Sequence, residues 1–282
     1  MSVDEVNCIK TNCIEINRKQ VMDQFADYVS NYDASDEKIK LKIEHTYRVA
    51  SLCQRIAQSI GLDRQDVDLA WLMGMLHDIG RFEQLRQYGT FSDADSIDHA
   101  HYGVKILFED HEIEHYITAH AGDEMYELTR TAIWNHSAYR VQEGIPERAK
   151  MFCDILRDAD KVDILKVNHD VPMEVIYNVT TEELKHASVT DEVMQQFQEH
   201  HAILRSVKKT CVDNIVGHAA LVFELVYPES MRAVQEQGYL EKLLAFQSEN
   251  EKTQQQFAVL RKCMEEYLKA ENIACLSVGA IL

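Results

Sequence analysis

Two histidines and two aspartates occupy positions where a folded chain rarely leaves polar groups without a partner. His77 and Asp78 end a mostly apolar helical stretch, and His45 and Asp160 each interrupt an apolar helix face. A buried carboxylate is unfavourable unless it is paired or binds a metal ion. Neutral imidazole and carboxylate together suit Zn, Mn, Fe and Ni. If these helices pack face to face, the four residues predict a buried site for a divalent metal ion.

Three helices must position these residues. The first is expected to begin at the capping signal Ser35-Asp36-Glu37 and to end at Gly61. Its apolar face repeats at steps of three and four residues, through His45, Val49, Leu52, Ile56 and Ile60. The second begins near Asp63 and ends over residues 76–80. The third begins at Pro146 and places in line Phe152, Leu156, Asp160 and Ile164.

The composition favours an all-α fold. The chain has 282 residues but only 10 Gly and 3 Pro, which leaves little room for the turns of a sandwich or barrel. Its length suits one large domain or two small ones, and no repeat, low-complexity tract or linker divides it. We therefore expect a lead-in over residues 1–18 and a single helical domain over residues 19–282.

The rest of the chain is also expected to be largely helical. An acidic run at 93–98 lies within a loop rich in Asp and Ser. Of two interpretations, a solvated loop and a lid that attracts metal ions, we favour the solvated loop. Thr180 and Glu183 have the spacing of a capping box. The apolar tail at 273–282 would dock on the domain or on a partner. Further helices are expected at 111–120, 124–137, 191–226 and 238–270.

The net charge limits the partners. The chain carries 29 Lys and Arg against 47 Asp and Glu, a net of −18, which opposes binding to a nucleic acid polymer. A small phosphate ester in a local positive pocket remains compatible with that charge. No apolar run approaches the roughly 20 residues that span a bilayer. The first ten residues lack the order of a signal peptide, and seven scattered cysteines suggest no disulfide framework. We expect a cytoplasmic protein without a membrane partner.

Three motifs resemble the HD superfamily of metal-dependent phosphohydrolases, which is named for the pattern His…His-Asp…Asp. They are His45-Thr-Tyr-Arg48, Gly74-Met-Leu-His77-Asp78-Ile-Gly-Arg81-Phe82, and Ile155-Leu-Arg-Asp158-Ala-Asp160-Lys161-Val-Asp163. Together they cover a core of about 40–168. The resemblance implies an HD-type helical bundle with additional C-terminal helices over about 180–282.

The resemblance also implies a ligand set. It assigns His45, His77, Asp78 and Asp160 to one metal ion, and the neighbouring Asp158 and Asp163 are expected to contact solvent or the ligands. Many family members bind a second metal through two further histidines, whose positions His99 and His136 resemble. His101 points away from the helix face that carries His99. The expected cofactor is thus one or two divalent metal ions per chain, of the set Mn, Fe, Ni, Zn or Mg.

The chemistry implied by the family is hydrolysis of a small phosphate ester, such as a nucleotide or related phosphomonoester, by a metal-activated hydroxide. Asp78 and Asp160 are the candidates to accept the proton of the nucleophile. Arg81, directly after His77-Asp78-Ile-Gly, and Lys161 are the candidates to bind the substrate phosphate. The Gly-Tyr-Pro element of the cyclic-di-GMP branch is absent after Arg81.

Two other functions use the same residues. Relatives of this fold include di-iron oxygenases, which would employ the same six ligands and would reveal themselves by iron-dependent oxygen consumption. Other relatives are non-catalytic signalling or binding modules, which would bind a ligand tightly without turnover. The sequence leaves the oligomeric state open, with a homodimer as one option.

Overall fold

The computed structural model describes residues 15–172 and 179–279, and for residues 169, 170 and 272–279 it describes the backbone only. The described residues form helices and no strand, so the predicted all-α class is confirmed. The first half contains α1 (Arg18–Val29), α2 (Glu37–Ser59), α3 (Arg64–Leu76), α4 (Ile79–Tyr88), α5 (His99–Val104), α6 (Glu124–Asn135) and α7 (Glu147–Asp170). The second half contains α9 (Thr181–His186), α10 (Asp191–Gln198), α11 (Val212–Ala219), α12 (Pro228–Gln237), α13 (Tyr239–Leu244) and α14 (Glu251–Gly279).

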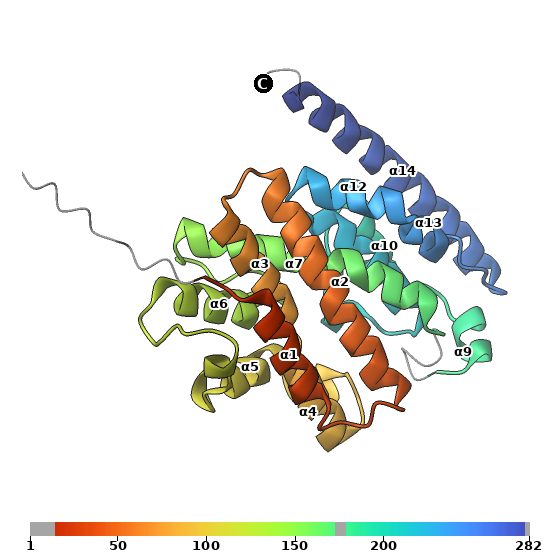
Figure 1. Ribbon diagram of the computed structural model, residues 1–282. Coiled ribbons are helices and arrows are strands. Elements are labelled where there is room, and N and C mark those ends of the chain that lie inside the picture. Colours follow the sequence, from red (N-terminus) through yellow and green to blue (C-terminus); the bar gives the residue numbers. More distant parts are fainter. Residues whose placement is uncertain (1–14, 173–178, 280–282) are drawn as a thin grey trace, which may run out of the picture.

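Helices α2 and α7 lie at the centre of the molecule. Helix α2 packs against α3 and α7, and α6 also packs against α7. Figure 1 shows α14 beside α12 and α13, on the side of the molecule away from α4 and α5. The central helices are capped as the sequence indicates, since the side chains of Asp36 and Asp63 accept backbone N–H groups at the starts of α2 and α3.

Two close approaches between helices require glycine. A Cβ at Gly74 of α3 would lie 2.5 Å from the Cα of Ala50 in α2, so a side chain there would push the two helices apart. A Cβ at Gly80 of α4 would lie 2.3 Å from the carbonyl oxygen of His99 at the start of α5. These two contacts bring the elements that carry the predicted histidines to backbone contact distance.

The C-terminal half is joined to α7 by a buried carboxylate. Asp158 accepts hydrogen bonds from the backbone N–H groups of Val226 and Tyr227 and from the Ser230 hydroxyl, at 2.7–3.1 Å. These groups lie at the start of α12, where free backbone donors need acceptors. Asp158 was expected to contact solvent or the predicted ligands, and this was wrong. It is fully buried and fixes the C-terminal helices onto α7.

Several expected helices differ in the structure. Residues 111–120 form only a 3₁₀ turn, η3 (Glu112–His115), because His111 adopts a left-handed φ of 64°. The apolar spacing there reflects burial of Ile113, Tyr116 and Ile117 in a loop, not a helix face. Helix α4, directly after His77 and Asp78, was not predicted.

The segment expected to be helical over 191–226 is divided into α10, α11 and two 3₁₀ turns, η4 (Arg205–Val207) and η5 (Ala220–Glu224). The buried carboxylate of Asp213 accepts the backbone N–H groups of Thr190, Lys209 and Thr210, which holds the chain before α11 out of a helix. The capping box of Thr180 and Glu183 is confirmed. Most of the lead-in and the side chains of the apolar tail lie outside the described residues. Within the part described, no helix has the length and apolar character to cross a bilayer.

Candidate metal centre

The junction of α3 and α4 carries the His-Asp pair. Helix α3 ends at Leu76, His77 follows as its C-cap, and Asp78 is the N-cap of α4. An N-cap aspartate ordinarily accepts a backbone N–H of its own helix. The Asp78 side chain makes no such bond, so its carboxylate is free to turn into the core. There it meets His45 from the middle of α2.

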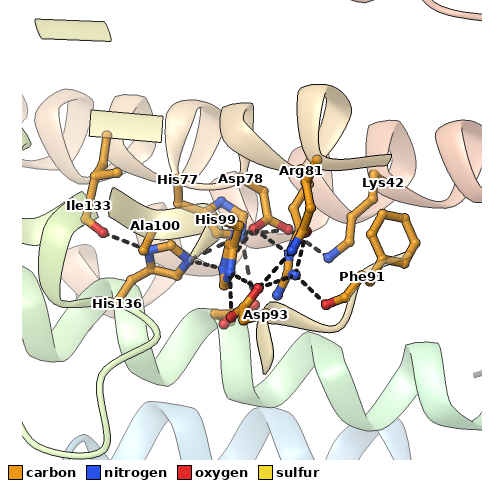
Figure 2. A network of polar contacts seen from close by, with 12 residues as sticks. Lys42, His77, Asp78, Arg81, Phe91, Asp93, His99, Ala100, Ile133 and His136 are labelled. Atoms are coloured by element: carbon orange, nitrogen blue, oxygen red, sulfur yellow. Dashed lines mark hydrogen bonds and ion pairs between the residues drawn. The ribbon is translucent and has the colours of Figure 1, made fainter. Parts of the chain in front are cut away.

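Three further elements complete the cluster. His99 is the first residue of α5, whose N-cap Asp98 accepts the N–H groups of Ala100 and His101. His136 is the C-cap of α6, and Asp160 lies in the middle of α7. Figure 2 shows His77, His99 and His136 converging on Asp78. The structure thus brings together all six residues that the sequence singled out as ligands, namely His45, His77, Asp78, His99, His136 and Asp160.

The six residues form two groups that share Asp78. Its Oδ2 lies 3.5 Å from His45 Nε2 and 3.6 Å from His77 Nε2, and Asp160 Oδ1 lies 3.1 and 3.7 Å from the same two nitrogens. The other oxygen of Asp78, Oδ1, lies 3.5 Å from His99 Nε2 and 3.8 Å from His136 Nε2. Both His-His-Asp groups are compact enough to hold a metal ion, and all five of their residues are buried.

The outer nitrogen of every imidazole is engaged. Each Nδ1 lies 2.6–2.9 Å from an oxygen that can only accept a hydrogen bond, so each ring carries its proton on Nδ1. The partners are Asp163 for His45, the carbonyl of Gly74 for His77, Asp93 for His99 and the carbonyl of Ile133 for His136. Each inner Nε2 therefore presents a lone pair, as a metal-binding histidine does.

These lone pairs face one another at short range. His45 Nε2 lies 3.3 Å from His77 Nε2, and His99 Nε2 lies 3.0 Å from His136 Nε2. Two acceptors at such a distance repel unless a cation or a proton lies between them. The donor set, imidazole nitrogens and carboxylate oxygens without a thiolate, suits a divalent metal ion. The residues present therefore fit the cofactor that the sequence predicted.

Electrostatics favour the ionised form of Asp78 and Asp160 and the neutral form of His99, which are the forms that a metal ion requires. Burial opposes charge on His45, but Asp160 and Asp163 raise its pKa above the ordinary value. Burial opposes charge on Asp78, but Lys42 and His77 outweigh it and hold the Asp78 pKa well below its usual range. Burial likewise opposes charge on Asp160, yet the adjacent side chains of His45 and His77 hold the Asp160 pKa well below its usual range. Burial, with a contribution from Arg81, lowers the pKa of His99 to about 3, so its ring is neutral at pH 7.

Arg81 lies beside the cluster but is largely held by a loop. Its Nη1 donates to Gln84 Oε1, to the Phe91 carbonyl and to Asp93 Oδ1 at 2.6–2.9 Å. Its Nε lies 3.6 Å from Asp78 Oδ1, and this buried nitrogen has no hydrogen-bond partner among the described residues. The Nη1 group of Arg81 therefore positions the 91–93 loop, and its Nε faces the cluster.

Lys161, the other predicted substrate-binding residue, is turned toward the C-terminal half. Its Nζ donates to the carbonyl of Glu224 at 3.2 Å. Burial lowers the pKa of Lys161 to about 8. A substrate contact would require the ammonium to give up this hydrogen bond, so the substrate-binding role of Lys161 stays a prediction.

Sequence reasoning missed three residues that contact the predicted ligands. Lys42 Nζ pairs with Asp78 Oδ2 at 2.7 Å, one helical turn before His45. Asp93 is only 8% exposed and holds His99, although its acidic loop had been taken as solvated. Arg157 donates to the carbonyls of Asn135 and His136 and so fixes the turn that carries His136. The only sequence signal was the i, i+3 spacing of Lys42 and His45 on one helix face.

Asp163 is expected to act as an orienting residue. Its carboxylate accepts from His45 Nδ1 at 2.6 Å and pairs with Arg48 at 2.7 Å. Replacing Asp163 with Asn is expected to weaken binding of Mn²⁺ by about 10- to 100-fold, since a carboxylate behind a metal-binding histidine raises its basicity. Titration of the purified protein with Mn²⁺ measures this. Glu44→Gln, which alters an exposed partner of the same arginine at 3.7 Å, should leave the affinity unchanged; equal losses in both variants would refute the role.

Comparison with known proteins gives one match. The HD domain family model matches residues 43–168, the segment from α2 to the end part of α7 that carries all six clustered residues. Neither the curated proteins nor the solved structures include a match to this chain. The matched segment has the expected all-α fold and two His/Asp groups able to hold a metal ion. Residues 43–168 of the chain therefore form an HD domain, and proteins with this domain are generally metal-dependent hydrolases.

Proposed function

We propose that this protein is a metal-dependent phosphohydrolase that cleaves a small phosphate ester, a nucleotide or related phosphomonoester. The observation that carries the proposal is the pair of inward-facing Nε2 contacts, at 3.3 and 3.0 Å, arranged on the two oxygens of Asp78. A carboxylate shared between two His-rich groups would bring two metal ions close together, and a pair of close metal ions is what two-metal hydrolases use. Metal ions held there would lower the pKa of a bound water and stabilise charge on phosphoryl oxygens.

The roles proposed for Asp160 and Asp78 follow from how far each side chain is exposed to solvent. The four histidines and Asp78 are at most 3% exposed as side chains, whereas Asp160 is 15% exposed. Asp160 is therefore the carboxylate at the open edge of the cluster, where water and substrate enter. In the proposed reaction a water oxygen bonds to phosphorus and one of its protons passes to Asp160. The ester P–O bond breaks, and the leaving oxygen takes up a proton from solvent. Asp78 stays ionised and holds the geometry.

Arg81 supplies the predicted phosphate contact. Its unpartnered Nε lies at the side of Asp78 that faces His99 and His136. A guanidinium nitrogen without an acceptor fits an incoming phosphate oxygen. The chain's net charge of −18 supports a small ester over a polynucleotide.

Phosphate release tests the proposal. The purified protein is stripped with a chelator, refilled separately with Mn²⁺, Fe²⁺, Ni²⁺, Zn²⁺ or Mg²⁺, and assayed with p-nitrophenyl phosphate and the nucleoside monophosphates. We expect phosphate release that requires a refilled metal ion. No release with any of the five ions would refute the proposal. Oxygen consumption by the iron-loaded protein, without phosphate release, would identify a di-iron oxygenase instead.

A further inference from the structure

The two oxygens of Asp78 have matching surroundings. Oδ2 lies near His45 and His77 and pairs with the ammonium of Lys42 at 2.7 Å. Oδ1 lies near His99 and His136 and faces Arg81 Nε at 3.6 Å. Each half of the cluster thus contains two imidazoles, one oxygen of Asp78 and one cation, and the His45–His77 half also contains Asp160. Figure 2 shows that Lys42 and Arg81 both point toward the Asp78 carboxylate.

The two cations differ in how firmly the protein holds them. Arg81 Nη1 donates three hydrogen bonds to Gln84, Phe91 and Asp93, all outside the cluster. The hydrogen bond of Lys42 Nζ goes to Asp78 itself, and its other described contact is with the face of the Phe91 ring, 5.4 Å from the ring centre. Lys42 is therefore the cation that can move its hydrogen bonds to a ligand without breaking a loop.

The position of Lys42 also conflicts with metal binding unless an anion is present. The Lys42 ammonium contacts Asp78 Oδ2, the oxygen that would bind a metal ion together with His45 and His77. Two cations that share one carboxylate oxygen repel each other strongly at low solvent exposure, and the Lys42 side chain is only 16% exposed. A phosphoryl group, with several anionic oxygens, would relieve this repulsion by giving the ammonium a new acceptor.

We propose that Lys42 is a substrate-binding residue whose ammonium leaves Asp78 and holds the phosphoryl oxygens on the His45–His77 side of the cluster. The inference rests on the proposed function, because it assigns the ligand to the same site. It makes two linked claims. Lys42 strengthens phosphate binding, and in the absence of phosphate it weakens metal binding by competing for Asp78.

Calorimetric titration tests both claims without turnover. Mn²⁺ is titrated into the chelator-stripped protein, and inorganic phosphate is then titrated into the Mn²⁺-loaded protein. For Lys42→Met we expect phosphate affinity to fall by about tenfold or more, as a charge-assisted hydrogen bond is lost. We expect Mn²⁺ affinity without phosphate to rise by about threefold or more, as a nearby like charge is removed. Lys42→Arg should recover most of the phosphate affinity.

Matched variants separate this role from a structural one. Lys40→Met alters an exposed lysine of α2 and should change neither affinity. Lys42→Gln, which keeps a polar tip, is measured beside Lys42→Met, and thermal unfolding establishes that both are folded. The proposal is overturned if the Lys42 variants match Lys40→Met in phosphate affinity, or if Mn²⁺ and phosphate affinity fall together. Phosphate binding that depends on Lys42 in a protein that hydrolyses no ester would refute the proposed function while supporting this inference.

Discussion

Asp78→Asn is expected to lower metal-dependent phosphate release by a factor on the order of 10³. The two oxygens of Asp78 serve the two His-rich groups separately, at 3.5–3.6 Å on one side and 3.5–3.8 Å on the other. Asparagine keeps the shape of the side chain but carries no charge, and its NH₂ group cannot bind a metal ion. One substitution therefore removes the ligand oxygen of one group and the negative charge that both groups share. Initial rates of phosphate release with saturating Mn²⁺ measure the effect.

His101→Ala is the matched control for this experiment. His101 lies two residues from His99 on α5, is half-exposed and stacks on Trp134 with 3.7 Å between ring centres. Its removal takes away an imidazole next to the centre without touching the cluster, so the rate should stay within about twofold of the unsubstituted protein. An Asp78→Asn variant as active as His101→Ala would contradict the shared-carboxylate arrangement.

Removal of the metal should also lower stability by a large amount. In the described cluster four imidazole lone pairs and two carboxylates face one another within 4 Å, an arrangement that a bound cation relieves. A ligand at 100 times its dissociation constant stabilises the folded state by about 2.7 kcal/mol per site. For a chain of this size that corresponds to roughly 5–10 °C in the unfolding temperature per site. Scanning calorimetry with Mn²⁺ and with excess chelator measures the difference.

The same scan on variants shows where the stabilisation arises. His101→Ala should keep the full shift, and Asp78→Asn should lose most of it. A shift of equal size in both variants would mean that Mn²⁺ binds elsewhere on this acidic protein. No shift in the unsubstituted protein would mean that the cluster does not bind the ion.

The ligand set could be predicted because each member leaves a local signal. His45 and Asp160 interrupt apolar helix faces at steps of three and four, and His77 and Asp78 end a helix that is otherwise apolar. Such patterns depend on neighbours one turn away, which a sequence displays directly. The resemblance to the HD superfamily then added His99 and His136, and the structure places both within 4 Å of Asp78.

The supporting residues could not be predicted because their partners are distant along the chain. Arg157 fixes the His136 turn from 21 positions away, and Asp158 meets the start of α12 about 70 positions later. Asp93 follows an acidic, turn-forming pattern that usually indicates solvent exposure. Only the packing of Arg81 and His99 around it makes it buried. The helix expected at 111–120 failed for a related reason, since buried loop residues imitated the period of a helix.

The central claim is that the cluster is a two-metal centre built on Asp78. Elemental analysis of the purified protein, after refilling with Mn²⁺ and removal of free ion, tests it most directly, beside the variants Asp78→Ala and His136→Ala. The account predicts about two metal ions per chain in the unsubstituted protein, about one in His136→Ala, and fewer than one in Asp78→Ala. No bound metal in the refilled, unsubstituted protein, or an unchanged content in Asp78→Ala, would contradict it.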